Sequence, residues 1–196
     1  MPRLMLALAC AVIASVSAVA QQSSTVIDTF RSRYGSLKSV DVSFESQGMR
    51  GRVRAQKGGK YRIEVSDRLF ICDATTVWNV QSATTTVIVN RYQPNAESMS
   101  IDRVFFVLMN VYRPTVLRMH PTTVIRLLPP DPSATIAGVT HADIALNAKG
   151  TITSISVSES GVESVWNVTR LLRNPTIAAS TFSYVPPTGW TVINLR

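Results

Sequence analysis

The side chains that could do chemistry in this chain are few and lie far apart in the sequence. Its 196 residues contain two histidines, His120 and His141, and two cysteines, Cys10 and Cys72. Zinc sites gather several Cys, His or acidic ligands, commonly from closely spaced pairs, and no pair of Cys or His here has that spacing. The sequence also contains no G-x-S-x-G elbow and no Gly-rich phosphate loop. We therefore expect no metal, no cofactor and no catalytic residue.

Cys72 is the one side chain that could still act as a nucleophile. It lies in RLFICDATTVW, a stretch with the composition of a strand, where a cysteine is ordinarily a buried structural thiol. Nothing in the sequence pairs it with a base that would activate it. We predict that the protein is not an enzyme, and a Cys72-dependent enzyme is kept as an alternative.

A basic segment, GRVRAQKGGKYRIEV, occupies residues 51–65 and is typical of a hairpin whose turn is Gly58-Gly59. Side chains of a strand alternate between its two faces. One face of this hairpin carries most of its basic residues, which are Arg52, Arg54, Lys60 and Arg62. The other face is apolar apart from one lysine, and it carries Val53, Ala55, Lys57, Tyr61, Ile63 and Val65.

The first residues indicate export. Arg3 precedes an apolar run from Leu4 to Val16, and Ala18-Val19-Ala20 offers a cleavage site, as in a secretory signal peptide. We therefore expect residues 1–20 to be removed and residues 21–196 to form a single exported domain. The net charge of +8 would fall to about +7 because the signal carries Arg3. Cys10 lies inside the apolar run, so we expect no lipidation there.

Export narrows what the basic face can bind. Nucleic-acid surfaces interleave basic and aromatic residues, and this face has no aromatic residue among its charges. We expect no nucleic acid. The face is either an ordinary solvated surface or a docking face for an acidic protein partner or an anionic bilayer.

Alternating apolar and polar residues recur along the chain in short segments separated by turn-forming residues, which indicates one antiparallel meander of about eleven strands. The segments are residues 40–45, 52–57, 60–65, 70–73, 77–80, 84–90, 122–128, 139–147, 150–158, 163–172, 180–185 and 190–195. Two segments favour helix instead. Residues 25–34 have apolar residues at helical spacing before Gly35, and Ser100 can cap a second helix that is apolar on all sides. Such a helix must be covered, either in a core or over an apolar cavity.

The order of these segments resembles the LolA family, periplasmic carriers of outer-membrane lipoproteins. The resemblance rests on SLKSVDVSFES, the hairpin GRVRAQKGGKYRIEV, FICDATTVWNV, NRYQPNAESMSIDRVFFVLMN, ADIALNAKGTITSISV and the ending FSYVPPTGWTVINL. No single motif is specific, and the ordered set over nearly the whole chain carries the resemblance. Two positions depart from the family: Lys57-Gly58 stands where Arg-Pro is common, and Asp73-Ala74 stands in place of an Asp-Gly turn.

The resemblance implies an unclosed antiparallel β-barrel of about eleven strands, an α+β fold of mainly β type, with short helices as a lid. Acyl chains of lipoproteins would lie between lid and sheet, with Lys57 contacting the lid. It also implies a monomer that receives lipoproteins from an inner-membrane lipoprotein-releasing transporter and passes them to an outer-membrane acceptor. The residues expected to line the cavity are Val53, Ala55, Tyr61, Ile63, Val65, Phe70, Trp78, Val80, Val87, Val89, Phe105 and Leu108. A LolB-like or RseB-like half-barrel that binds another lipid or senses envelope stress is the alternative of the same fold.

Overall fold

A computed structural model describes residues 21–94, 100–118 and 122–196 of the chain. The expected signal peptide, Cys10 and His120 lie outside the described residues. The sheet consists of β1 (Ser39–Ser46), β2 (Met49–Gln56), β3 (Lys60–Val65), β4 (Arg68–Asp73), β5 (Thr76–Gln81), β6 (Thr86–Arg91), β7 (Arg113–Arg118), β8 (Thr123–Leu128), β9 (Val139–Leu146), β10 (Ile152–Glu159), β11 (Val162–Arg173) and β12 (Thr191–Asn194).

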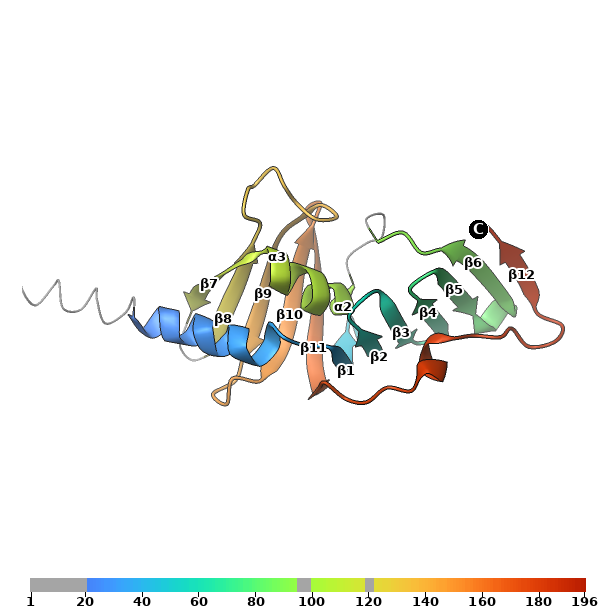
Figure 1. Ribbon diagram of the computed structural model, residues 1–196, viewed down its shortest axis with the longest axis horizontal. Helices are drawn as coiled ribbons and strands as arrows, with labels where there is room; N and C mark the ends of the chain where they lie inside the picture. Colours follow the sequence, from blue (N-terminus) through green and yellow to red (C-terminus); the bar gives the residue numbers. More distant parts are fainter. Residues whose placement is uncertain (1–20, 95–99, 119–121) are drawn as a thin grey trace, which may run out of the picture.

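These strands form a single sheet in the order β12-β6-β5-β4-β3-β2-β1-β11-β10-β9-β8-β7. Every neighbouring pair is antiparallel except β12 and β6, which are parallel. Two hairpin runs, β1–β6 and β7–β11, meet where β1 pairs with β11 (Figure 1). The sheet ends at β12 and at β7, so the predicted fold class, an unclosed and mainly antiparallel barrel with helices, is confirmed.

Two expected strand assignments change. Residues 113–118 form β7, which was not expected as a strand. Residues 180–185 were expected as a strand, and Ala179–Phe182 form a 3-10 helix instead. This helix belongs to a segment that crosses outside the sheet before β12 (Figure 1). Its backbone therefore has no neighbouring strand with which to pair.

The N-terminal helix spans residues 21–34 of the described chain and lies across the half of the sheet that contains β7–β10 (Figure 1). Phe30 and Tyr34 are buried in the core. The Tyr34 hydroxyl donates to the carbonyl of Gly150 at 3.0 Å and accepts from the amide of Ile152 at 3.3 Å, which ties the helix to the β9–β10 hairpin. The helix ends as expected at Gly35, whose amide donates to the carbonyl of Arg31.

The second helical segment consists of α2 (Ile101–Arg103), a π-helical stretch (Val104–Leu108) and α3 (Met109–Val111). It lies on the concave side of the sheet, and its stripe of Ile101, Val104, Phe105 and Leu108 is buried in the main core. The half-buried Phe106 and Met109 pack against the same core. The core therefore contacts more than one side of this helix, which explains why its sequence is apolar almost all round. Ser100 precedes the helix, but its hydroxyl donates to Asp102 rather than to a backbone amide.

Apolar residues gather in two separate clusters on the two faces of the sheet. The main cluster lies on the concave side under the helices. The second cluster consists of Val80, Val87 and Val89 with Leu69, Trp78, Tyr184 and Trp190 packed against them. Tyr184 and Trp190 come from the segment between β11 and β12, so this segment covers the outer face of β4–β6. No helix of the described residues is long and apolar enough to cross a bilayer.

Candidate lipid-binding cavity

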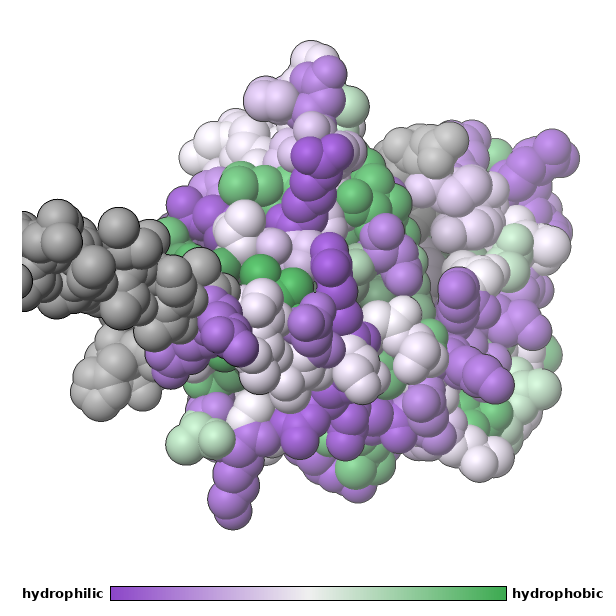
Figure 2. Space-filling model, turned by 60° about the vertical axis from the view of Figure 1, so that its left-hand side comes forward, coloured by the Kyte–Doolittle hydropathy of each residue, from purple (hydrophilic) through white to green (hydrophobic). Residues whose placement is uncertain are grey.

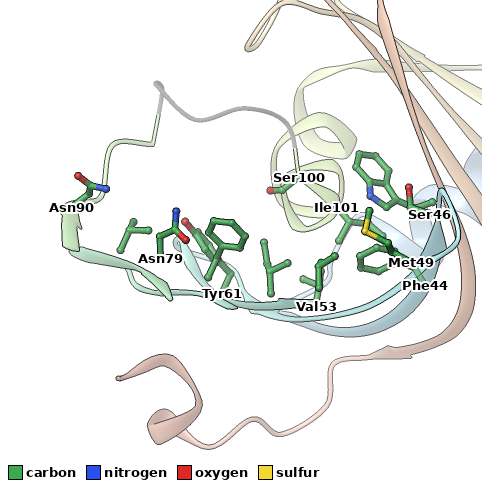
Figure 3. Close-up of a pocket in the computed structure, with 14 residues that line it drawn as sticks. Phe44, Ser46, Met49, Val53, Tyr61, Asn79, Asn90, Ser100 and Ile101 are labelled. Atoms are coloured by element: carbon green, nitrogen blue, oxygen red, sulfur yellow. The ribbon is translucent and has the colours of Figure 1, made fainter. Parts of the chain in front are cut away.

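A cavity of about 460 Å³ lies between the concave face of β1–β6 and the start of α2 (Figure 3). Its volume is within the range of small-molecule sites, about 300–1,000 Å³. The lining residues are Phe44, Ser46, Met49, Val53, Tyr61, Ile63, Val65, Phe70, Val77, Asn79, Asn90, Ser100, Ile101 and Trp166. None of these residues, which belong to the described part of the chain, carries a charge. The arrangement can hold an apolar chain.

Strand register explains why these side chains meet. Val53 of β2 pairs with Ile63 of β3, and Ile63 pairs with Phe70 of β4. Directly paired residues point to the same face of a sheet, so the three form a row across the cavity floor. Phe70 then pairs with Asn79 of β5, which extends the row with a polar residue.

Phe44 forms part of the floor because its partner is a glycine. Phe44 of β1 pairs with Gly51 of β2 on the concave face. A Cβ atom at Gly51 would overlap Cζ of the Phe44 ring and lie 2.8 Å from its Cε1. The ring therefore lies over the glycine backbone. A larger residue at position 51 would push the ring into the cavity.

The start of α2 forms the other wall and contains a buried carboxyl group. The Ser100 hydroxyl donates to Oδ1 of Asp102 at 2.6 Å. Asp102 and Arg103 are both buried, with 7% and 8% of their surface exposed. Burial raises the pKa of Asp102 above its usual value, although the Ser100 bond and the Arg103 charge act against this. A buried carboxyl group thus lies directly behind the cavity wall.

Five of the residues expected on the cavity wall do line it: Val53, Tyr61, Ile63, Val65 and Phe70. Three others, Ala55, Phe105 and Leu108, lie in the main core with no more than 1% of their surface exposed. They support the floor and the helix rather than facing the open space.

The remaining four expected wall residues require a correction. Trp78, Val80, Val87 and Val89 belong to the second cluster, on the opposite face of the sheet. Asn79 and Asn90 take the cavity face of β5 and β6 instead. The physical reason is that the segment between β11 and β12 covers the outer face of β5 and β6. Apolar side chains on that face are therefore buried as well. Alternation separated the two sets correctly, but it could not say which set faces the cavity.

Lys57 also differs from its expected place. It lies in the exposed turn after β2, and its backbone amide donates to the carbonyl of Lys38 at 2.9 Å. Within the described residues, no hydrogen bond or ion pair joins its side chain to the helices. The turn projects beyond the last residue pair of β2 and β3, Gln56 and Lys60, which carries the ammonium into solvent. The expected lid contact is therefore not made in this structure.

The four basic residues of the hairpin lie on the sheet face away from the cavity, and three of them are paired with acids. Arg52 donates from Nε and Nη2 to the two carboxylate oxygens of Asp41, at 2.8 and 2.7 Å. Arg54 and Arg62 both donate to Oε1 of Glu64, at 2.8 and 2.6 Å. Lys60 is exposed. The positive charge of this face is thus partly neutralised within the sheet. Figure 2 shows one side of the molecule, on which hydrophilic and hydrophobic side chains are interspersed.

Several lining residues escaped prediction from the sequence. Phe44 and Met49 come from the β1–β2 hairpin, and Trp166 comes from β11, which lies beside them only through the long-range β1–β11 pairing. Val77 and Ile101 were assigned to other faces or to the core. The alternation of Phe44 with Ser43 and Glu45 was visible, but not which strands would lie beside it.

Cys72 and His141 are the described side chains that the sequence offered for chemistry, and they do not form a site together. The Cys72 thiol is buried, and it accepts from the amide of Ala74 at 3.3 Å. His141 is half-exposed beside Thr140. No group of three or more His, Cys, Asp or Glu that could hold a metal occurs in the part of the chain that the structure describes.

Comparison with solved structures finds chains that are similar over most of their length. An uncharacterized conserved protein from Thermus thermophilus matches with a TM-score of 0.50 and 11% identity, over 87% of this chain and 98% of its own. A LolA superfamily protein from Nitrosomonas europaea matches with a TM-score of 0.39 and 10% identity, over 83% of this chain and 97% of its own. A domain named for outer membrane lipoprotein sorting, from Vibrio parahaemolyticus, matches with a TM-score of 0.44 and 11% identity, over 83% and 97% of the two chains. At these identities the likeness concerns the fold alone.

No protein-family model and no curated protein matches the sequence. The fold that the LolA resemblance implies, an unclosed and mainly antiparallel barrel with helices, is the fold of this structure. What the protein binds must therefore be inferred from its own cavity.

Proposed function

We propose that the protein is a carrier of acylated molecules, with the acyl chains of lipoproteins as its ligands. The observation that supports this most is the uncharged cavity between the sheet and α2, which is lined mainly by aliphatic and aromatic side chains. Each methylene group moved from water into such a space contributes about 0.8 kcal/mol. An acyl chain can thus bind firmly without any catalytic group. The choice of lipoproteins within this class comes from the sequence resemblance.

A carrier also needs a compartment, partners and a surface on which they dock. The periplasm is the proposed compartment, and a lipoprotein-releasing transporter and an outer-membrane acceptor are the proposed partners. The outer face of β1–β3 is the proposed docking face, because Lys60 and Arg50 are exposed on this part of the sheet. Its ion pairs leave only a modest positive field, so docking through it would weaken as salt rises.

A displacement assay tests the proposal. The protein, expressed without residues 1–20, is loaded with a fluorescent acyl probe and titrated with a synthetic triacylated lipopeptide. Ile63→Trp, on the cavity floor, should abolish probe binding by filling the space. Ile193→Trp, at an exposed position in β12, is the matched control and should bind like wild type. Equal binding by both variants, or none by the wild type, would overturn the proposed function.

A further inference from the structure

The cavity has one polar end and one apolar end. Asn79 and Asn90 lie at one end, Phe44 and Met49 lie at the other, and Val53 and Tyr61 lie between them (Figure 3). The two amide side chains come from neighbouring strands, β5 and β6. A ligand that fills the cavity therefore meets different chemistry at its two ends.

The polar groups of the cavity differ in whether the protein already satisfies them. The Ser46 hydroxyl donates to the carbonyl of Val165 at 2.6 Å, and the Ser100 hydroxyl donates to Asp102. In contrast, Oδ1 of Asn79 is buried and has no hydrogen-bond partner among the described residues. No hydrogen bond to the side-chain amide of Asn90 occurs in that part of the chain either. A buried polar atom without a partner is unfavourable, so Oδ1 of Asn79 is an acceptor that a ligand N–H, such as that of an amide linkage, would satisfy. The half-buried Asn90 offers a second amide beside it, and the NH₂ group of either residue can donate to a ligand carbonyl.

Register brings the two amides within reach of one ligand group. Asn79 pairs with Ile88, and Val77 pairs with Asn90, so the two asparagines are diagonal neighbours on the same face. Diagonal neighbours of an antiparallel pair lie about 7–8 Å apart, within reach of side chains that converge on one polar group. An amide side chain offers both a carbonyl acceptor and NH₂ donors, and turning it by half a rotation exchanges them.

The lack of charge decides which ligand groups fit this end. Among the described residues that line the cavity, none is Lys, Arg, Asp or Glu. A phosphate or a free carboxylate would lose its hydration here without gaining an ion partner, which is strongly unfavourable. A neutral carbonyl group would lose less hydration free energy on entering the cavity, and it can accept a hydrogen bond from an asparagine NH₂ group. The carbonyl that joins an acyl chain to its carrier, in an ester or an amide, has this character.

We propose that Asn79 and Asn90 form a polar anchor that binds the neutral ester or amide linkage of an acylated ligand. The acyl chain then extends along Val53 and Ile63 toward Phe44 and Trp166. This inference rests on the proposed carrier function and adds the orientation of the ligand and the chemistry of its bound end. It also predicts discrimination against free fatty acids, whose carboxylate would be placed at the anchor.

Four probes of equal chain length test the anchor: methyl palmitate, palmitamide, palmitate at pH 8 and hexadecane, each measured by displacement of a fluorescent acyl probe. The comparison is made between proteins for the same probe, so that differences in probe solubility cancel. Asn79→Leu and Asn90→Leu should each weaken binding of the ester and the amide about fivefold to tenfold. Binding of hexadecane should be unchanged or tighter. Val77→Leu, an apolar change beside both asparagines, is the matched control and should shift all four probes alike.

The outcomes separate the anchor from the carrier function. A loss of affinity in Asn79→Leu that is equal for the ester and for hexadecane would overturn the anchor and leave the cavity as an apolar site. A loss of palmitate affinity in Asn79→Leu as large as the loss for its methyl ester would overturn the preference for neutral ends. Failure of every probe to bind wild type would overturn the carrier function itself. Thermal unfolding completes the test, because Asn79→Leu without ligand should be at least as stable as wild type, and a clear loss of stability would show that Asn79 is structural.

Discussion

Phe44 and Gly51 face each other across β1 and β2, and the aromatic ring occupies the space that any side chain at position 51 would need. This relationship sets the height of the cavity floor at the end opposite Asn79. It also links the fold to the proposed function. Because Gly51 has no side chain, the Phe44 ring lies against the backbone and leaves the cavity open.

Gly51→Ala should therefore weaken acyl-probe binding. The added methyl group displaces the Phe44 ring into the cavity, and overpacking of this kind costs about 1–3 kcal/mol in stability. Gly51→Ala/Phe44→Leu should recover much of both losses because leucine leaves room for the methyl group. Probe titration and urea unfolding of the single and double variants measure the coupling. Additive effects in the double variant would show that the two positions act independently.

Ala74→Gly should stabilise the protein by about 1 kcal/mol, because a non-glycine residue with a positive φ costs about that much or more. Ala74 has a φ of 82° in the β4–β5 turn, where Asp73 accepts from the amides of Thr75 and Thr76. The control is Ala178→Gly, at an exposed residue with a φ of −63°, which should be neutral or destabilising because glycine gains freedom in the unfolded chain. Thermal unfolding of both variants measures the effect. A lower unfolding midpoint for Ala74→Gly than for wild type would show that the backbone of Ala74 is not strained.

The Arg52–Asp41 pair should make stability depend on pH in the acid range. The hydrogen bond and charge of Arg52 hold the pKa of Asp41 below its usual value despite partial burial. A lowered pKa in the folded state means that the stabilisation is present above the unfolded pKa, about 3.9, and is lost as pH falls through the folded value. Arg52→Leu should cost about 1 kcal/mol at pH 7, a modest figure because 39% of the Arg52 side chain is exposed.

Urea unfolding of wild type and Arg52→Leu between pH 2 and pH 7 measures this difference. The two curves should converge as Asp41 becomes protonated. Arg50→Leu is the control, because its partner pair with Glu45 is largely exposed and should contribute little at any pH. A constant gap between wild type and Arg52→Leu down to pH 2 would assign its effect to packing instead.

Asp102 should produce the opposite dependence. Burial raises the pKa of its carboxyl group, so the protonated form is favoured in the folded state. Its contribution is fully present below the unfolded pKa, about 3.9, and is lost as pH rises through the folded value. Asp102→Asn, which still accepts from Ser100, should match wild type at acid pH and exceed it in stability as pH rises. Unfolding midpoints at a series of pH values test this, and a variant less stable than wild type at neutral pH would show that Asp102 is held as a paired carboxylate.

Trp190→Ala should destabilise the protein by about 2 kcal/mol because it uncovers the second cluster on the outer face of β5 and β6. This figure is below the usual cost of removing a fully buried tryptophan, since Trp190 is half-buried. Val192→Ala in β12, at a position with 49% of its surface exposed, should change stability by less than about 0.5 kcal/mol. Equal effects from the two changes would mean that the segment before β12 contributes little to the fold.

The sequence by itself determined most of the elements and which residues of a strand share a face. Alternation in the hairpin separated Val53 and Ile63 from Arg52 and Arg62, and the structure keeps these sets on opposite faces of the sheet. Helical spacing before Gly35 located the first helix. These features are local: a period of two or of 3.6 and a turn residue fix them within a few residues.

Only the tertiary structure decided which apolar face encloses the cavity. In β5 and β6, apolar residues are buried on the outer face because the segment carrying Tyr184 and Trp190 returns over it, about a hundred residues later in the chain. The concave face of β5 and β6 carries Asn79 and Asn90 instead. Alternation divides a strand into two sets, but burial depends on what distant segment covers each set. The position of Trp166 beside Phe44 has the same cause, because the pairing of β1 with β11 joins parts of the chain that no local pattern connects.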